Sequence, residues 1–210
     1  MARQHVDVSP MNRPIFEGLN RPPSINSPYI GFDIETYSPN GFPRDGEDTV
    51  VAATLAISVG RDPRKGLLLL SLIYPPSQEE TLLTWLHCFL SSSQGNCLVT
   101  YNGAQFDLRY VVHRGRRHGI SFENVFSNYE HIDLYEAVRR SGLRLPSYGQ
   151  KAIEGFMGIG RVVDDLSGAS YYKAFQNFLR FGSLKPLFYN MEDSVGCLHI
   201  LKGLTINNHF

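Results

Sequence analysis

The sequence predicts one layered domain of the α/β or α+β class, in which a β-sheet packs against helices. Three β-branched and aliphatic segments come first, helical and strand-like segments then alternate, and the last segments are helical. This order is typical of a layered fold, and no linker-like stretch divides it. With 210 residues, the chain can bury about 70% of its unfolded surface in one core. We therefore expect one domain over residues 28–210, preceded by a loosely attached, proline-containing arm over residues 1–27.

The first three elements are expected to be strands. Alternation of apolar and polar side chains predicts a strand over Tyr29–Thr36. Thr49–Val59 and Gly66–Tyr74 are rich in β-branched and aliphatic residues, which favours two further strands. Dense turn chemistry in Tyr37–Asp48 predicts a long surface loop between the first two strands.

Helices and two short strands are expected to follow. Ser77 and Glu80 have the spacing of a capping box, before apolar residues that recur at helical spacing through Leu90. A second such pattern lies in Ser147–Gln150. The short strands are expected at Cys97–Tyr101 and Ile132–Leu134. Later helices are expected near Gln105–Arg114, in a segment that ends at Arg140, and in a segment that begins after Ser147. The last two are expected over Tyr171–Phe181 and Leu184–Leu204.

Charge and cysteine content exclude several classes of protein. Lys and Arg total 20 and Asp and Glu total 20, so the formal net charge is zero. A polycation that coats nucleic acid is therefore excluded, and contacts to nucleic acid must come from local patches. The three cysteines, Cys88, Cys97 and Cys197, are widely spaced, which argues against a disulfide framework or a thiolate zinc site and fits a reducing compartment. No apolar stretch approaches the roughly 18 residues of a membrane span, so we expect a cytoplasmic protein.

Asp33 and Glu35 form the first candidate site. They lie two residues apart at the end of a strand and therefore point the same way, with Cβ atoms about 7 Å apart. Like charges at that distance repel by roughly 2 kcal/mol at an effective dielectric constant of about 20. A bound cation would explain this arrangement. The alternative is that both acids simply enter a polar turn.

Asp107 is the acid of the second candidate site. Asn102 and Gly103 form a turn after a short strand, and Asp107 falls in the first turn of the next helix. Because the helix dipole favours an acid there in any protein, Asp107 alone is a weak indication of function.

Asp193 is the acid of the third candidate site. It lies four residues after Tyr189, so the two share a helix face. That face continues in an apolar stripe, Gly196, Cys197, Ile200 and Leu201. Asp193 is therefore expected to point inward and to need a basic partner, hydrogen-bond donors or a metal. The alternative is an Asp bonded to the N-terminus of a neighbouring helix, whereas Glu192 is expected to be solvated.

The order of these motifs resembles the DEDD superfamily of exonucleases, in its tyrosine branch. The motifs are D-x-E after the first strand, N-G-x-x-F-D, and Y-x-x-x-D on a late helix. The segments Leu145–Lys151 and Asp165–Gly168 are similar to the archaeal and bacterial predicted-exonuclease subgroup. The resemblance extends from about Tyr29 to Leu204. His199 follows the last Asp, whereas the histidine branch places its His before it.

This resemblance implies a ribonuclease-H-like fold, with helices flanking a central mixed sheet of five strands, three antiparallel and then two parallel. It implies two divalent ions held by Asp33, Glu35, Asp107 and Asp193, with Tyr189 orienting the attacking water. A carboxylate-only ligand set also favours Mg²⁺ or Mn²⁺ over zinc. The implied activity is 3′–5′ exonuclease hydrolysis of single-stranded nucleic acid, with DNA favoured and RNA not excluded.

Five further residues are expected to bind substrate: Thr36, Asn102, Phe106, Ser147 and Lys151. The resemblance implies that Asn102 and Phe106 contact the terminal sugar or base. Ser147 and Lys151 lie at a helix start that can meet a phosphate, although an ordinary capped helix is an equal alternative. Asp133 is expected to help orient the site residues without itself binding a metal ion.

Rival functions remain open. The same site chemistry suits a hydrolase of very short oligonucleotides or an exonuclease directed at RNA. A non-catalytic nucleic-acid-binding or partner-docking module with this fold is the rival from another class. The presence of all four acids and of Tyr189 argues against that module.

Overall fold

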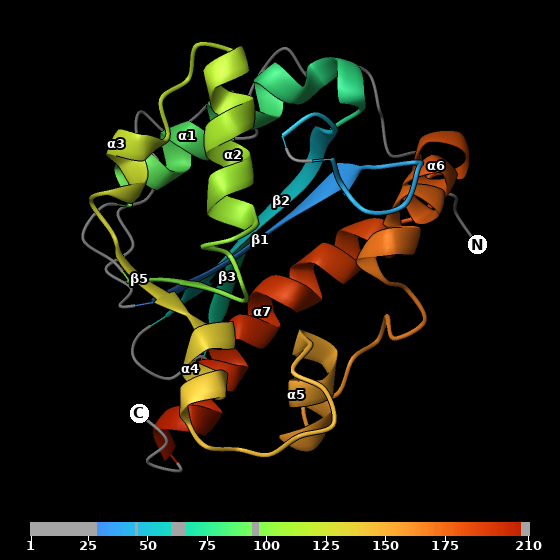
Figure 1. Ribbon diagram of the computed structural model, residues 1–210. Coiled ribbons are helices and arrows are strands. Elements are labelled where there is room, and N and C mark those ends of the chain that lie inside the picture. The colour runs from blue at the N-terminus through green and yellow to red at the C-terminus, as the bar shows by residue number, and fades with distance from the viewer. Residues whose placement is uncertain (1–28, 45, 60–65, 94–96, 207–210) are drawn as a thin grey trace.

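The computed structural model describes residues 29–44, 46–59, 66–93 and 97–206, and the arm predicted over residues 1–27 lies outside these ranges. Within them the centre is a five-stranded sheet in the order β3-β2-β1-β4-β5 (Figure 1). The strands are β1 (Tyr29–Tyr37), β2 (Thr49–Ser58), β3 (Leu67–Ile73), β4 (Cys97–Thr100) and β5 (Glu130–Asp133). β1, β2 and β3 pair antiparallel, whereas β4 and β5 continue the sheet in parallel from β1. The predicted mixed sheet is confirmed.

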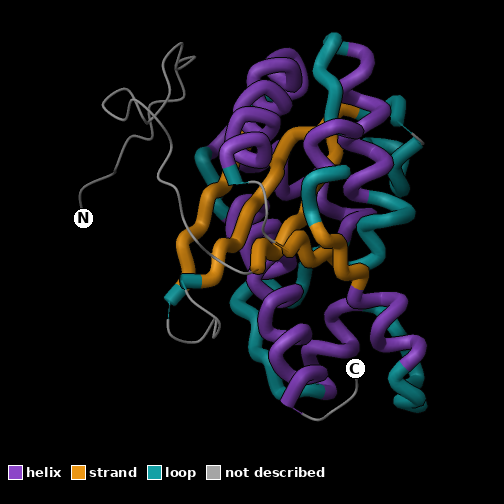
Figure 2. The backbone as a smooth tube through the Cα atoms, turned by 90° about the vertical axis from the view of Figure 1, so that its left-hand side faces the viewer, coloured by secondary structure: helices purple, strands orange, loops and turns teal. Residues whose placement is uncertain are grey.

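Helices pack on both faces of this sheet (Figures 1 and 2). One face is covered by α1 (Glu79–Ser92), α2 (Asp107–Arg117) and α3 (Glu123–Phe126). The other is covered by α4 (Leu134–Arg140), α5 (Gln150–Phe156), α6 (Tyr171–Phe181) and α7 (Lys185–Ile206). Two 3₁₀ turns, Pro76–Gln78 and Gly168–Ser170, precede α1 and α6. Among the described residues, no helix has both the length and the apolarity needed to cross a membrane.

β1 separates the two layers through its alternating side chains. Ile30, Phe32 and Ile34 are buried against α1 and α2. On the opposite face, a Cβ at Gly31 would lie 2.1 Å from the carbonyl oxygen of Ser194 in α7. Because glycine leaves that space free, α7 crosses directly over β1 (Figure 1). This close crossing brings the middle of α7 to the acidic end of β1.

The two predicted capping boxes are wrong. α1 begins at Glu79 after the 3₁₀ turn, and its N-cap residue makes no side-chain bond. α5 begins at Gln150 with Gly149 as its N-cap. The hydroxyl of Ser147 accepts a hydrogen bond from the Gly149 N–H instead, at 3.2 Å. In both places a local turn, with a proline in the first case, satisfies the backbone before the helix begins.

Candidate active site

Three of the predicted acids meet at one point. Asp33 and Glu35 come from β1 and Asp193 comes from α7, and each offers a carboxylate oxygen within 4.8 Å of the other two. Glu35 and Asp193 are buried, and Asp33 is half-buried. Oxygen ligands converging at this spacing form the kind of site that binds a hard divalent cation.

Asp107 lies beside this group and is fixed by the backbone of β1. Its buried carboxylate accepts a hydrogen bond from the N–H of Ile34 at 3.0 Å. Ile34 lies between the two acids of the first motif, so this bond ties the start of α2 to the acidic end of β1. The structure therefore brings all four predicted ligands together, although Asp107 does not belong to the three acids whose oxygens lie within 4.8 Å.

Burial and mutual repulsion leave these acids poorly stabilised as anions. Burial, followed by the neighbouring carboxylates, raises the pKa of Asp33 and of Glu35 well above their usual values. Burial raises the pKa of Asp107 to about 7. It raises the pKa of Asp193 to about 6, against the opposing effect of Arg161. Because a cation would favour the ionised forms, the residues present fit a divalent metal.

Asn190 fixes the orientation of Asp33, and sequence analysis missed it. Its side-chain amide donates to Asp33 Oδ2 at 2.7 Å and accepts from the Thr54 hydroxyl at 2.6 Å. Asn190 is fully buried. The signal was present in the sequence, because Asn190, Ser194 and Cys197 follow helical spacing and place polar residues on the buried face of α7.

Arg161 is the basic partner that the burial of Asp193 required. Its Nη1 lies 2.7 Å from Asp193 Oδ1 and 2.8 Å from Glu154 Oε2, and its side chain is 7% exposed. The alternative of a helix N-terminus as the partner of Asp193 is therefore wrong. Arg161 lies in the loop after α5, where periodicity gives no indication of a contact to α7. Sequence analysis could not identify it for that reason.

Glu192 was predicted to be solvated, and this prediction is wrong. Its carboxylate accepts the backbone N–H groups of Val162 and Val163, at 2.5 and 3.0 Å. The loop after α5 lies against α7. Because its backbone N–H groups are not in a helix or strand, they need other acceptors, and Glu192 of α7 provides them. Glu192 thereby pins the segment that carries Arg161.

Tyr189 lies one helical turn before Asp193 and is buried. Lys151 Nζ lies 5.0 Å and Arg161 Cζ lies 5.3 Å from the centre of its ring. Burial, and then the nearby carboxylates, raise the pKa of the Tyr189 phenol far above its usual value. Tyr189 is therefore a neutral phenol at physiological pH, suited to orient a water by hydrogen bonding rather than to remove a proton from it.

Three of the predicted substrate residues make internal contacts. Lys151 Nζ donates to the backbone oxygens of Asp164, at 3.0 Å, and of Leu166. The Thr36 hydroxyl lies 2.8 Å from that of Ser38 in a buried position. Phe106 packs against the core, with its ring 5.2 Å from that of Tyr110.

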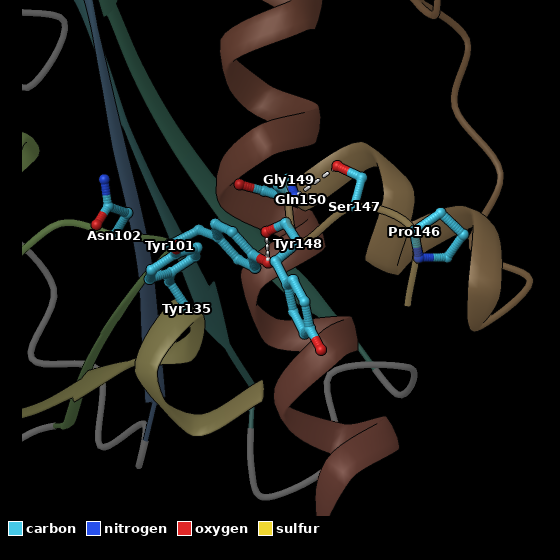
Figure 3. Close-up of a pocket in the computed structure, with 8 residues that line it drawn as sticks. All are labelled: Tyr101, Asn102, Tyr135, Pro146, Ser147, Tyr148, Gly149 and Gln150. Carbon is cyan, nitrogen blue, oxygen red and sulfur yellow. Dashed lines mark hydrogen bonds between the residues drawn. The ribbon is translucent and has the colours of Figure 1, made fainter. Parts of the chain in front are cut away.

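The other two predicted substrate residues, Asn102 and Ser147, line one pocket (Figure 3). The pocket has a volume of about 460 Å³ and is lined by Tyr101, Asn102, Tyr135, Pro146, Ser147, Tyr148, Gly149 and Gln150. One lining residue, Gln150, contacts α7 at Asp193, because its amide donates to the backbone oxygen of Asp193 at 2.7 Å.

Asp133 supports the turn of the second motif. Its carboxylate accepts backbone N–H groups from Asn102 at 2.8 Å, Ala104 at 3.0 Å and Tyr135 at 3.1 Å. Asn102 has a positive φ of 62°, a conformation that needs support from its surroundings. Asp133 thus supports the turn that leads to Asp107, and its role in orienting the site stays a prediction.

Comparisons with known proteins agree with this fold. The model of the RNase_H_2 family, in the RNase_H superfamily, matches residues 30–205. A search of curated proteins finds no match. Among solved structures, the family B DNA polymerase from the hyperthermophilic archaeon Pyrobaculum calidifontis is similar, with a TM-score of 0.68 and 18% identity. The match covers 84% of this chain but only 24% of the polymerase chain, and at this identity it shows the fold alone. From the family match, which spans almost the whole described region, the chain belongs to the RNase_H superfamily.

Proposed function

We propose that the protein is a divalent-metal-dependent 3′–5′ exonuclease that hydrolyses phosphodiester bonds in single-stranded nucleic acid, with DNA favoured. The observation that carries this proposal is the convergence of Asp33, Glu35 and Asp193 within 4.8 Å of one another, beside the buried Asp107. Buried acids with raised pKa values are typical of functional sites. A structural role would instead favour acids that are fully paired.

The four acids are proposed to hold two Mg²⁺ or Mn²⁺ ions. Such ions supply Lewis-acid stabilisation of the charge that develops on the phosphodiester and on its leaving oxygen. The chain holds its ligands ready: Asn190 orients Asp33, and the Ile34 N–H orients Asp107. Tyr189 is proposed to position the attacking water through its neutral hydroxyl.

The substrate end is proposed to lie in the pocket beside Asn102 and Ser147, since this pocket adjoins Asp193 through Gln150. Its tyrosine-containing wall suits an unpaired base, because aromatic rings stack on bases of any sequence. The similar solved structure is that of a DNA polymerase, which supports DNA as the first substrate to test. Contacts to a 2′-hydroxyl would decide in favour of RNA.

Single-stranded DNA and RNA oligonucleotides, labelled at either end, test this function. With Mg²⁺ or Mn²⁺, we expect a 5′ label to give a descending ladder and a 3′ label to appear at once in mononucleotides. EDTA should stop both. Internal fragments without a ladder would instead support an endonuclease. Activity confined to the shortest oligonucleotides would support the small-substrate hydrolase, and binding without cleavage would support a non-catalytic module.

A further inference from the structure

Arg161 is paired in an unusual way for a buried arginine. One nitrogen, Nη1, serves two acids from different helices, Asp193 in α7 and Glu154 in α5. The other two nitrogens, Nε and Nη2, are buried and have no hydrogen-bond partner among the described residues, although Nε lies 3.8 Å from Glu192 Oε2 in a longer ion pair. Unpaired buried donors are costly, and arginines in purely structural pairs usually engage both oxygens of a carboxylate. The guanidinium is thus held at the site without being fully satisfied there.

Glu154 is placed to hold Arg161 independently of the metal-binding acids. Its side chain is 1% exposed, and Gln150 Nε2 donates to its Oε1 at 3.0 Å. A Cβ at Gly196 of α7 would lie 2.0 Å from Glu154 Oε1, so α7 leaves space for this carboxylate only because position 196 is glycine. Glu154 does not belong to the group of three acids that converge.

A divalent ion at the three converging acids has to share Asp193 with this guanidinium. Two cations held by one carboxylate repel each other strongly where water is largely excluded. If Asp193 turns to the ion, Arg161 keeps its short ion pair with Glu154 and the longer one between its Nε and Glu192. The loop backbone would stay in place, because Glu192 accepts the N–H groups of Val162 and Val163.

We propose that Arg161 is a resident counter-ion of the carboxylate cluster, which neutralises Asp193 while no divalent ion is bound and is retained by Glu154, with Glu192 as a more distant partner, when an ion binds. Arg161 therefore lowers the affinity of the site for divalent ions, and Glu154 restores part of it by retaining the guanidinium. This inference rests on the proposed metal site and extends it to two residues outside the acidic motifs.

Calorimetric titration of the full chain with Mn²⁺ at pH 8 tests this exchange without measuring nuclease activity. Arg161→Gln should bind Mn²⁺ about tenfold more tightly, because it removes a competing charge. Glu154→Gln should bind more weakly, by about fivefold, because the short ion pair with Asp193 is then the main partner left to Arg161, with Glu192 3.8 Å from its Nε.

The double variant distinguishes exchange from a simple effect of nearby charge. With exchange, Glu154→Gln has no effect once Arg161 is Gln, so the double variant should bind like Arg161→Gln alone. Additive changes, or changes of the same sign in the two single variants, would overturn the proposal. Thermal melting in EDTA verifies that each variant folds. If Arg161→Gln does not fold, Arg161→Lys serves in its place: it keeps one charge and should stay close to wild type in affinity, and a gain as large as tenfold would count against competition by charge.

The same titration separates this inference from the proposed function. Wild-type protein that binds no Mn²⁺ would overturn the metal site and the exchange together. Wild-type protein that binds Mn²⁺ while the Arg161 and Glu154 variants bind it equally well would overturn the exchange alone.

Discussion

Two clusters of buried charge, built from the same residue types, differ in how completely they are satisfied. In the first, Glu79 of α1 accepts hydrogen bonds from both Arg114 Nε and Nη2 of α2, from His118, and from the Val50 N–H of β2. The remaining nitrogen of Arg114 donates to the backbone oxygens of Gly46 and Glu47. In the second cluster, acids crowd together beside an arginine, two of whose nitrogens donate no hydrogen bond among the described residues.

The acid–base properties of the two clusters differ accordingly. Burial alone would raise the pKa of Glu79, but hydrogen bonds from Arg114 and His118 hold it below its usual value. Burial raises the pKa of Asp33, Glu35, Asp107 and Asp193 instead. The first cluster is complete and ties α1, α2 and the loop before β2 together. The second leaves its acids poorly stabilised as anions, which is the physical difference expected between a structural ion pair and the proposed binding site.

The largest expected effect is the loss of activity in Asp193→Asn. Removing one shared ligand should lower kcat/KM at least about 1,000-fold, because stabilisation of the transition state by metal ions is worth several kcal/mol. The fold should survive, since Asn still offers an oxygen to Arg161. Glu123→Gln is the matched control, as Glu123 lies at the surface and pairs with Arg116 and Ser121. Full activity in Asp193→Asn would remove this residue from the site.

The complete cluster should respond in stability rather than in activity. Arg114→Met leaves Glu79 buried without its main partner, and breaking a buried pair in this way costs about 3 kcal/mol or more. Urea denaturation should show the loss, while Mn²⁺ affinity measured on the folded variant should match wild type. A variant of unchanged stability would contradict the structural role assigned to this pair.

The raised pKa values in the cluster of acids around Asp193 should make its affinity for divalent ions depend on pH. Because the pKa values of Asp107 and Asp193 are raised to about 7 and about 6, a divalent ion must displace protons from the folded protein below those values. Affinity for Mg²⁺ should therefore rise at least about tenfold from pH 6 to pH 8. Calorimetry in two buffers of different ionisation enthalpy would measure the protons released. A flat profile over this range would contradict the raised values.

Without metal, the stability of the fold should change with pH in the opposite direction to the metal affinity. Acids whose folded pKa is raised bind more protons in the folded state, so stability in EDTA should fall as pH rises from about 4 to about 7. The lowered pKa of Glu79 works the other way, because its contribution is lost only as pH falls below the unfolded value of about 4.3. Thermal melting with EDTA and with Mg²⁺ across this range separates the two contributions.

Short-range periodicity predicted the individual strands and the directions of three acids, whereas the five-stranded sheet and the joint ligand set, Asp107 included, were implied by the resemblance to the exonuclease family. Alternation in β1 put Asp33 and Glu35 on one face, and helical spacing in α7 turned Asp193 inward. Contacts of Arg161 and Asn190 depend instead on how the loop after α5 and strand β2 lie against α7, which no local pattern specifies. The failed capping box at Ser77 has a local origin instead, because the 3₁₀ turn Pro76–Gln78 comes directly before α1.

The smallest expected effect compares two adjacent tyrosines, Tyr189 and Tyr171, whose rings lie 6.0 Å apart. Tyr189→Phe should lower kcat by less than tenfold, since a positioning hydroxyl contributes less than the 100-fold or more typical of proton transfer. Its Mn²⁺ affinity should not change. Tyr171→Phe is the matched control, because the buried Tyr171 hydroxyl has no hydrogen-bond partner among the described residues, and its loss should be neutral or slightly stabilising. Equal losses of kcat in the two variants would assign both effects to packing, and a loss of 100-fold or more in Tyr189→Phe would indicate proton transfer by its phenol rather than positioning of the water.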